Sequence, residues 1–143
     1  MVYITTLFAS VLALVYIQLS LRVHQLEKLH QVSKESGDAD ALQSAIRTHG
    51  NFVEYVPLSL VLMTLLEIND APSLLVSALG ACLFVGVGLH VKGMRDSQHG
   101  ISNRVAGMKW LFLSLALLAL SNIVWMGYLL ILSARFASSV FVH

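Results

Sequence analysis

The sequence predicts an all-α integral membrane protein built as a bundle of four membrane-spanning helices. Of its 143 residues, 57% are hydrophobic and only 12% are charged. The apolar residues fall into four blocks, each close to the roughly 20 residues that a helix needs to cross a bilayer. A soluble domain of this length does not need so much apolar surface. We therefore expect one membrane domain over residues 1–143.

The four blocks also give the expected helix bounds. We expect helices over residues 2–34, 41–69, 72–92 and 103–133. The first block lacks the basic flank and small-residue cleavage site of a signal peptide, so we interpret it as a retained span. Pro72 suits the first turn of the third helix. The connection before it is short, which predicts an antiparallel hairpin of the second and third helices.

Two patterns inside the blocks predict how the helices pack. Ser73, Ser77 and Ala81 recur every four residues and form a face of small side chains, which lets helices approach closely. Asn122 lies inside the fourth block, where we expect its amide to form an interhelical hydrogen bond.

The basic residues are distributed unevenly between the two ends of the expected bundle. All but Arg135 of the nine Lys and Arg residues lie on the side of the first and third connections. The positive-inside rule puts these connections in the cytoplasm and both termini outside it.

The second block differs from the others because it carries four polar side chains on one helical face. Gln43, Arg47, Asn51 and Glu54 follow one another at spacings of four, four and three, and we call this set the polar stripe. Charged groups at membrane depth are costly unless they pair, face a polar cavity or bind a ligand. The stripe is therefore either a binding site or an internal Arg47–Glu54 pair that only fixes helix packing.

Composition and spacing argue against several other function classes. A net charge of +1 gives no basic field for nucleic acid. The histidines include no pair four residues apart, and the single cysteine, Cys82, has no histidine at a metal-binding spacing. A four-span proton-coupled exporter fits by size, but it would need a freely titrating carboxylate within the membrane. Here the first span contains no acid, and Glu54 is near Arg47.

Residues 46–58, IRTHGNFVEYVPL, resemble the signature of the MAPEG family, the membrane-associated proteins in eicosanoid and glutathione metabolism. The chain length, the four spans, the short second connection and the position of the motif also fit that family. The small bacterial inner-membrane branch is the most similar. The resemblance implies a homotrimer in the bacterial inner membrane, with glutathione as co-substrate bound between neighbouring subunits near their cytoplasmic ends.

The resemblance also implies roles for individual residues. Positions that contact glutathione in characterised members are occupied here by Arg47, Asn51, Glu54 and Tyr55. Arg104 stands at the position of the arginine proposed to activate the glutathione thiol. His90 falls near a position whose side chain can line the site, although a lone histidine at a helix end is more often an interfacial residue bonded to backbone.

These residue types suit the chemistry of glutathione. Arg47 offers a bidentate fork for a carboxylate. Glu54 can accept the ammonium or an amide N–H, and Asn51 can donate and accept at once. The Arg104 guanidinium would stabilise the thiolate, which is the nucleophile. A lipophilic electrophile would arrive from the bilayer.

Two function classes remain open at this point. The first is a glutathione-dependent transferase or peroxidase of the microsomal type. The second is a non-catalytic protein that binds a lipid or thiol ligand between subunits, because the resembling family includes a lipid-binding member. Gly93, Met94 and Ser97 lie where better-known enzymes of the family carry tyrosines, and Met108 replaces a further one.

Overall fold

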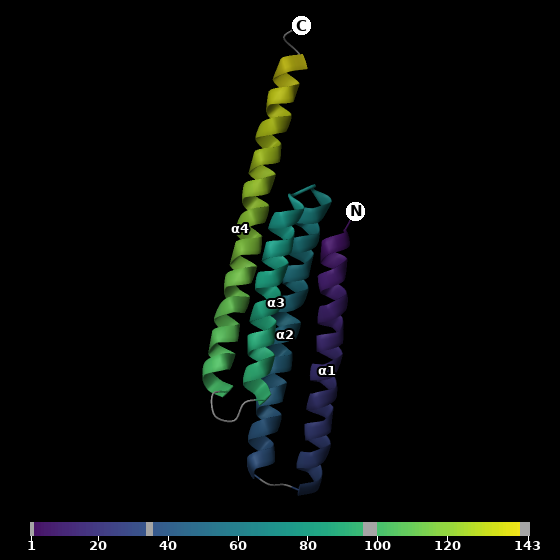
Figure 1. The fold of residues 1–143 in the computed structure, drawn as a ribbon, viewed down its shortest axis with the longest axis vertical. Coiled ribbons are helices and arrows are strands. Elements are labelled where there is room, and N and C mark those ends of the chain that lie inside the picture. Colours follow the sequence, from purple (N-terminus) through teal and green to yellow (C-terminus); the bar gives the residue numbers. More distant parts are fainter. Residues whose placement is uncertain (1, 34–35, 96–99, 141–143) are drawn as a thin grey trace.

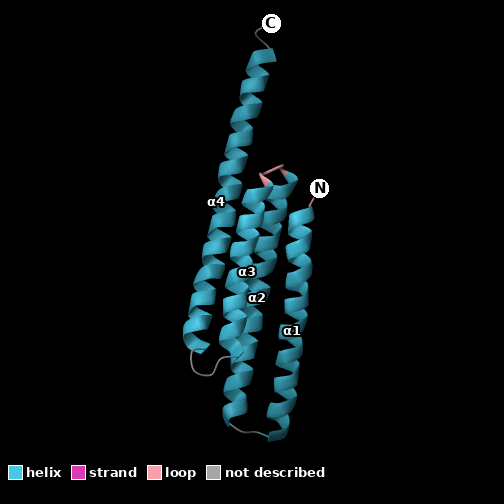
Figure 2. Ribbon diagram, in the orientation of Figure 1, coloured by secondary structure: helices cyan, strands magenta, loops and turns pink. Residues whose placement is uncertain are grey.

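The computed structural model describes residues 2–33, 36–95 and 100–140. Its helices are α1 (Tyr3–Ser33), α2 (Ser36–Ile68), α3 (Ser73–Arg95) and α4 (Gly100–Val140). They run along a common axis (Figure 1), and the described ranges contain no strand (Figure 2). Each helix includes a segment long and apolar enough to cross a membrane. The prediction of four spanning helices is confirmed, although α2 begins before residue 41 and α4 continues past residue 133.

The helices α2 and α3 lie at the centre of the bundle. Each of them adjoins all the other helices, whereas α1 and α4 do not adjoin one another over the described ranges. The N-terminus lies at the same end as the turn between α2 and α3, and α4 extends well past that turn (Figure 1). Because α2 touches all three partners, a side chain on α2 can face any of them or the outside.

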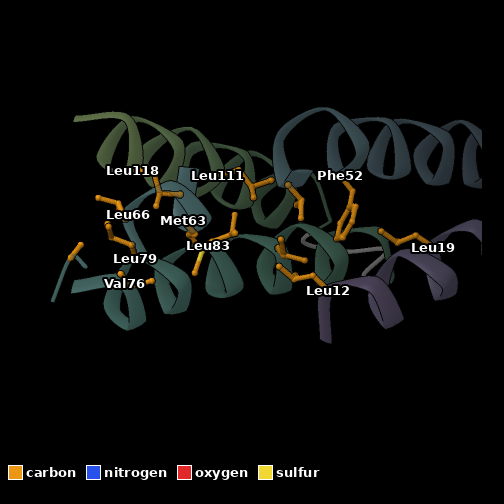
Figure 3. Close-up of a cluster of buried hydrophobic side chains, with 13 residues drawn as sticks. Leu12, Leu19, Phe52, Met63, Leu66, Val76, Leu79, Leu83, Leu111 and Leu118 are labelled. Carbon is orange, nitrogen blue, oxygen red and sulfur yellow. The ribbon is translucent and has the colours of Figure 1, made fainter. Parts of the chain in front are cut away.

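The core is a continuous column of apolar side chains along the bundle axis (Figure 3). Met63, Leu83 and Leu118, one from each of α2, α3 and α4, have no exposed surface. Leu12 and Leu19 extend the same cluster onto α1. Between helices in a bilayer the attraction comes chiefly from close packing rather than from exclusion of water, so this column is what fixes their relative positions.

Glycines, rather than the predicted small-residue face, allow the closest helix contacts on α3. A Cβ atom at Gly80 would lie 2.5 Å from the Phe8 ring, and one at Gly86 would lie 3.1 Å from the backbone of α4. Ser73 and Ala81 are exposed. The expectation of a close helix contact is therefore wrong within one subunit for Ser73 and Ala81, although Gly80, about 20° from Ser73 around the helix, does make such a contact.

A buried glutamate fastens the beginning of α1 to the end of α2. The Glu67 carboxylate accepts hydrogen bonds from the backbone N–H groups of Ile4 and Thr5, both at 2.8 Å, and from Thr5 Oγ1 at 2.7 Å. The first N–H groups of a helix have no partner within the helix. The carboxylate supplies that partner and also complements the positive end of the α1 dipole.

Two side chains of α4 fasten this same end of the bundle to α2. Asn122 Nδ2 donates to the backbone oxygen of Leu62 at 3.0 Å, so the predicted interhelical hydrogen bond is confirmed. Trp125 Nε1 donates to the backbone oxygen of Asn69 at 2.8 Å, in the turn between α2 and α3. Asp70 adopts a positive φ of 55° in that turn, a conformation that Asp tolerates better than most residues.

Candidate functional site

The polar stripe lies along the outer surface of α2. Gln43, Arg47 and Glu54 are exposed, and Asn51 is partly buried. Asn51 is displaced by about 40° from Arg47 around a helix of 3.6 residues per turn. That small rotation turns the Asn51 amide toward the other helices while its two charged neighbours point outward.

Asn51 joins α2 to both α3 and α4. Its Nδ2 lies 3.3 Å from His90 Nε2 on α3 and 3.5 Å from the Met108 sulfur on α4. An amide nitrogen donates, so His90 Nε2 is the acceptor of this contact. The structure therefore brings together two of the sequence-predicted site residues, Asn51 and His90.

A glycine on α4 makes this arrangement possible. His90 is only 4% exposed, and a Cβ at Gly107 would lie 2.5 Å from the His90 backbone nitrogen and 2.7 Å from its Cα. Any larger residue at position 107 would push α4 away from α3. Gly107 thus sets the distance at which His90 and Met108 can both reach Asn51.

Tyr55 lies beside the stripe and packs against α4. Its ring meets the Phe112 ring edge to face, with 4.9 Å between centroids, a favourable geometry for aromatic pairs. Tyr55 is partly buried. The stripe is therefore bordered by α4 on the side of Asn51 and Tyr55, and it is open on the side of Arg47 and Glu54.

The two charged residues of the stripe do not pair with each other. The His24–Glu27 contact on α1, at 3.7 Å, is an ion pair only when the histidine is protonated, and among the described residues neither Arg47 nor Glu54 takes part in an ion pair. The two residues are seven positions apart, about 10 Å along the helix, which is too far for a direct contact. The interpretation of the stripe as an internal Arg47–Glu54 brace therefore has no support within one subunit.

The side chain of Arg104 lies outside the described part of the structure, although its backbone belongs to α4. Position 104 is one helical turn before Met108, and Arg47 is one turn before Asn51. Helices α2 and α4 both start at the same end of the bundle (Figure 1). The two arginine positions therefore lie at a similar level, one turn beyond the Asn51–Met108 contact.

An apolar groove lies on the other side of the stripe, between α1 and α2. It has a volume of about 380 Å³, and its lining includes Tyr16, Phe52, Val53 and Pro57. Val53 directly precedes Glu54 in the chain. The groove is the size of a small-molecule site, and its apolar walls suit a lipophilic compound.

Sequence patterns alone do not identify two of the residues that form this arrangement. The motif comparison marks Met108 as a replaced tyrosine and not as a contact of Asn51, and it does not single out Gly107. An interior helical glycine costs about 1 kcal/mol relative to alanine, so its presence in the fourth span could have indicated a close helix approach.

Among the described residues, no group of three or more His, Cys, Asp or Glu side chains could hold a metal ion.

Comparison with known proteins identifies the family of the chain. The model of the MAPEG family matches residues 5–137. The chain belongs to the MAPEG family. It is also 35% identical, over 133 residues, to the inner membrane protein YecN of Escherichia coli strain K12 and to that of strain CFT073.

The match to these relatives extends over 92% of this chain and 99% of theirs. No solved structure matches the chain. The name of the relatives and the four apolar helices of this MAPEG chain together support a multi-pass protein of the inner membrane. The name states no activity.

Proposed function

We propose that this MAPEG protein is a glutathione-dependent transferase or peroxidase that acts on lipophilic electrophiles at the cytoplasmic side of the inner membrane. The observation that carries the proposal is the outward position of Arg47 and Glu54, which flank Asn51 without an ion-pair partner among the described residues. A cation and an anion held at this depth call for a zwitterionic ligand or a neighbouring subunit. Glutathione carries two carboxylates and one ammonium, so it has a partner for Arg47 and a partner for Glu54.

The proposal includes a homotrimer with the site between subunits. One subunit covers the stripe only on the side of α4, through Tyr55 and Met108. A neighbouring copy would close the other side and exclude water from the ligand. Cross-linking in mild detergent should end at a three-subunit band, and a folded protein that remains monomeric would contradict this assembly.

The residues divide the work of binding and activation. Arg47 binds a glutathione carboxylate, Glu54 binds the ammonium, and Asn51 is oriented by His90 to bind an amide. Arg104 stabilises the thiolate, which lowers the pKa of the bound thiol because a nearby cation favours the charged form. The thiol proton passes to water.

The reaction then depends on the electrophile that enters from the bilayer. In a transferase step the thiolate sulfur forms a bond to carbon, and the leaving group departs with the bonding electron pair. In a peroxidase step the thiolate attacks a peroxide oxygen and releases an alkoxide, which takes up a proton. A second glutathione reduces the resulting sulfenic acid to give glutathione disulfide and water.

Activity measurements on the detergent-purified protein test this proposal. Conjugation to 1-chloro-2,4-dinitrobenzene and reduction of a lipid hydroperoxide should both be assayed across pH at saturating glutathione. Arg104→Ala should move the pH profile to higher pH, since it raises the pKa of the bound thiol, while glutathione affinity changes less. Arg135→Ala removes the same charge at the far end of α4 and should leave the profile in place.

The second candidate function is a non-catalytic protein that binds a lipid or thiol ligand between subunits. It is favoured by Met108, whose thioether contacts Asn51 and offers only weak hydrogen bonding to a thiol. Saturable glutathione binding without turnover of either electrophile class, and with Arg104→Ala unchanged in every assay, would establish this second function and contradict the first.

A further inference from the structure

A cleft between α1 and α3 is distinct from the polar stripe and carries its own polar side chains. It has a volume of about 590 Å³ and is lined by Val15, Gln18, Leu19, Leu21, Arg22, Gln25 and Val91. Gln18, Arg22 and Gln25 follow one another at spacings of four and three and so share one face of α1. The cleft is thus an apolar groove crossed by one cation and two amides.

Arg22 has no negatively charged partner among the described residues. None of those that line the cleft carries a carboxylate, and Arg22 forms no ion pair with any described residue. Glu27, further along α1, lies 3.7 Å from His24. Lys92 follows Val91 on α3 and is exposed, so it adds positive charge near the cleft. A guanidinium in this position calls for an anionic ligand.

The depth of Arg22 identifies the kind of anion. Measured from Tyr3, Arg22 is about 28 Å along α1 at 1.5 Å per residue, which corresponds to the thickness of the hydrocarbon core of a bilayer. Arg22 therefore lies at the level of the lipid headgroups. Val15 and Leu19 lie one to two turns deeper, at the level of the acyl chains. Gln18 lies between these two residues, about 6 Å deeper than Arg22, so the lining keeps one polar group near the depth at which a phospholipid carries its ester oxygens.

We propose that this cleft binds an anionic phospholipid. Arg22 binds the phosphate, Gln25 binds headgroup oxygens, and Gln18, one turn deeper than Arg22, binds an ester oxygen of the glycerol backbone. An acyl chain lies along Val15 and Leu19. A volume of about 590 Å³ accommodates a headgroup and the first part of a chain. The site is on α1 and α3, so it is separate from the stripe on α2 and does not depend on glutathione chemistry.

Native mass spectrometry of the purified full-length protein tests the proposal. The protein is titrated with phosphatidylglycerol and with phosphatidylcholine that carry identical acyl chains. Wild type should prefer phosphatidylglycerol, and Arg22→Gln should weaken its binding about tenfold or more, the effect of losing a charge-assisted hydrogen bond. Lys109→Gln is the matched control, because it removes one charge from α4 at the same end of the bundle. It should bind as wild type does.

Further measurements distinguish a phospholipid in the cleft from surface electrostatic attraction, from a free phosphate and from glutathione. Gln18→Leu keeps the charge and should still weaken binding, which covers the case in which Arg22→Gln fails to fold. Equal losses in Arg22→Gln and Lys109→Gln would indicate only general electrostatic attraction and would overturn the site. Binding of glycerol phosphate, which has no acyl chains, as tightly as phosphatidylglycerol would overturn the lipid assignment. Loss of glutathione but not lipid in Arg22→Gln would assign the cleft to the thiol site instead.

Discussion

Replacing Gly107 by alanine should separate α3 from α4 and disturb the site at the same time. The new Cβ would lie 2.5 Å from the His90 nitrogen and 2.7 Å from its Cα. An ordinary contact is 3.4 Å or longer, so the helices must move apart by about 0.9 Å, the difference between 3.4 and 2.5. Both clashing atoms belong to the backbone and cannot rotate away. Overpacking of this kind costs about 1–3 kcal/mol.

The substitution also contributes favourably to the free energy of unfolding, and a matched control variant measures that contribution separately. Alanine stabilises a helix interior by about 1 kcal/mol relative to glycine. Gly127 lies on the same helix, and a Cβ there would meet nothing within 4 Å. Gly127→Ala therefore reports the favourable term alone. The free energies of unfolding of the two variants should differ by about 1–3 kcal/mol.

The assay is reversible unfolding in mixed detergent, followed by tryptophan fluorescence, together with glutathione affinity. Moving α4 away from α3 takes the Met108 sulfur away from the Asn51 amide, so we expect weaker glutathione binding in Gly107→Ala and none of that effect in Gly127→Ala. Equal stability of the two variants would refute the close approach of α3 and α4 at His90.

Three further predictions concern the packing and the orientation of the bundle. Glu67→Gln replaces one acceptor oxygen by a donor opposite the N–H groups of Ile4 and Thr5, so it should destabilise the protein by about 1–3 kcal/mol and expose the start of α1 to proteolysis; proteolysis equal to wild type would contradict this role. Asn122→Ala should cost about 0.6 kcal/mol, the average for hydrogen bonds between membrane helices, with glutathione binding unchanged. Loss of glutathione binding in Asn122→Ala would contradict this prediction and would show that the two ends of the bundle are coupled. Reporter fusions at the C-terminus and in the connection between α1 and α2 should report opposite compartments, and equal signals would defeat the assigned orientation.

The sequence was sufficient to predict the four spans because their signal is local. Long apolar blocks and the helix boundary at Pro72 define the helices without any knowledge of their neighbours. The helix ends were less predictable. α2 begins at Ser36 and α4 continues to Val140, since polar or mixed residues can continue a helix outside the bilayer, where the apolar pattern no longer marks its end.

The face of each helix that packs could not be predicted in the same way. Spacing identified the Ser73–Ser77–Ala81 face as a helix contact, but Ser73 and Ala81 are exposed and the close approach occurs at Gly80 and Gly86. Periodicity gives faces of one helix and not the rotation of that helix against its neighbours. That rotation is set by the core of all four helices together.

The candidate site was predicted in part for the same reason. Residues of the stripe are close in sequence, so their alignment on α2 follows from helix geometry alone. The contact of Asn51 with His90 and Met108 joins three helices. It depends on the close approach at Gly107. An interior glycine indicates that some helix approaches closely, but it does not specify which helix or at which residue.

Glutathione binding to the purified protein, measured by isothermal titration, tests the central claim most directly. Wild type should bind glutathione saturably, and Arg47→Gln should bind about tenfold or more weakly, because it loses a charge-assisted contact to a carboxylate. Arg135→Gln, at the far end of α4, should bind as wild type does. Absence of glutathione binding by the folded wild type, or equal affinity in Arg47→Gln, would contradict the claim that the polar stripe of α2 is a glutathione site.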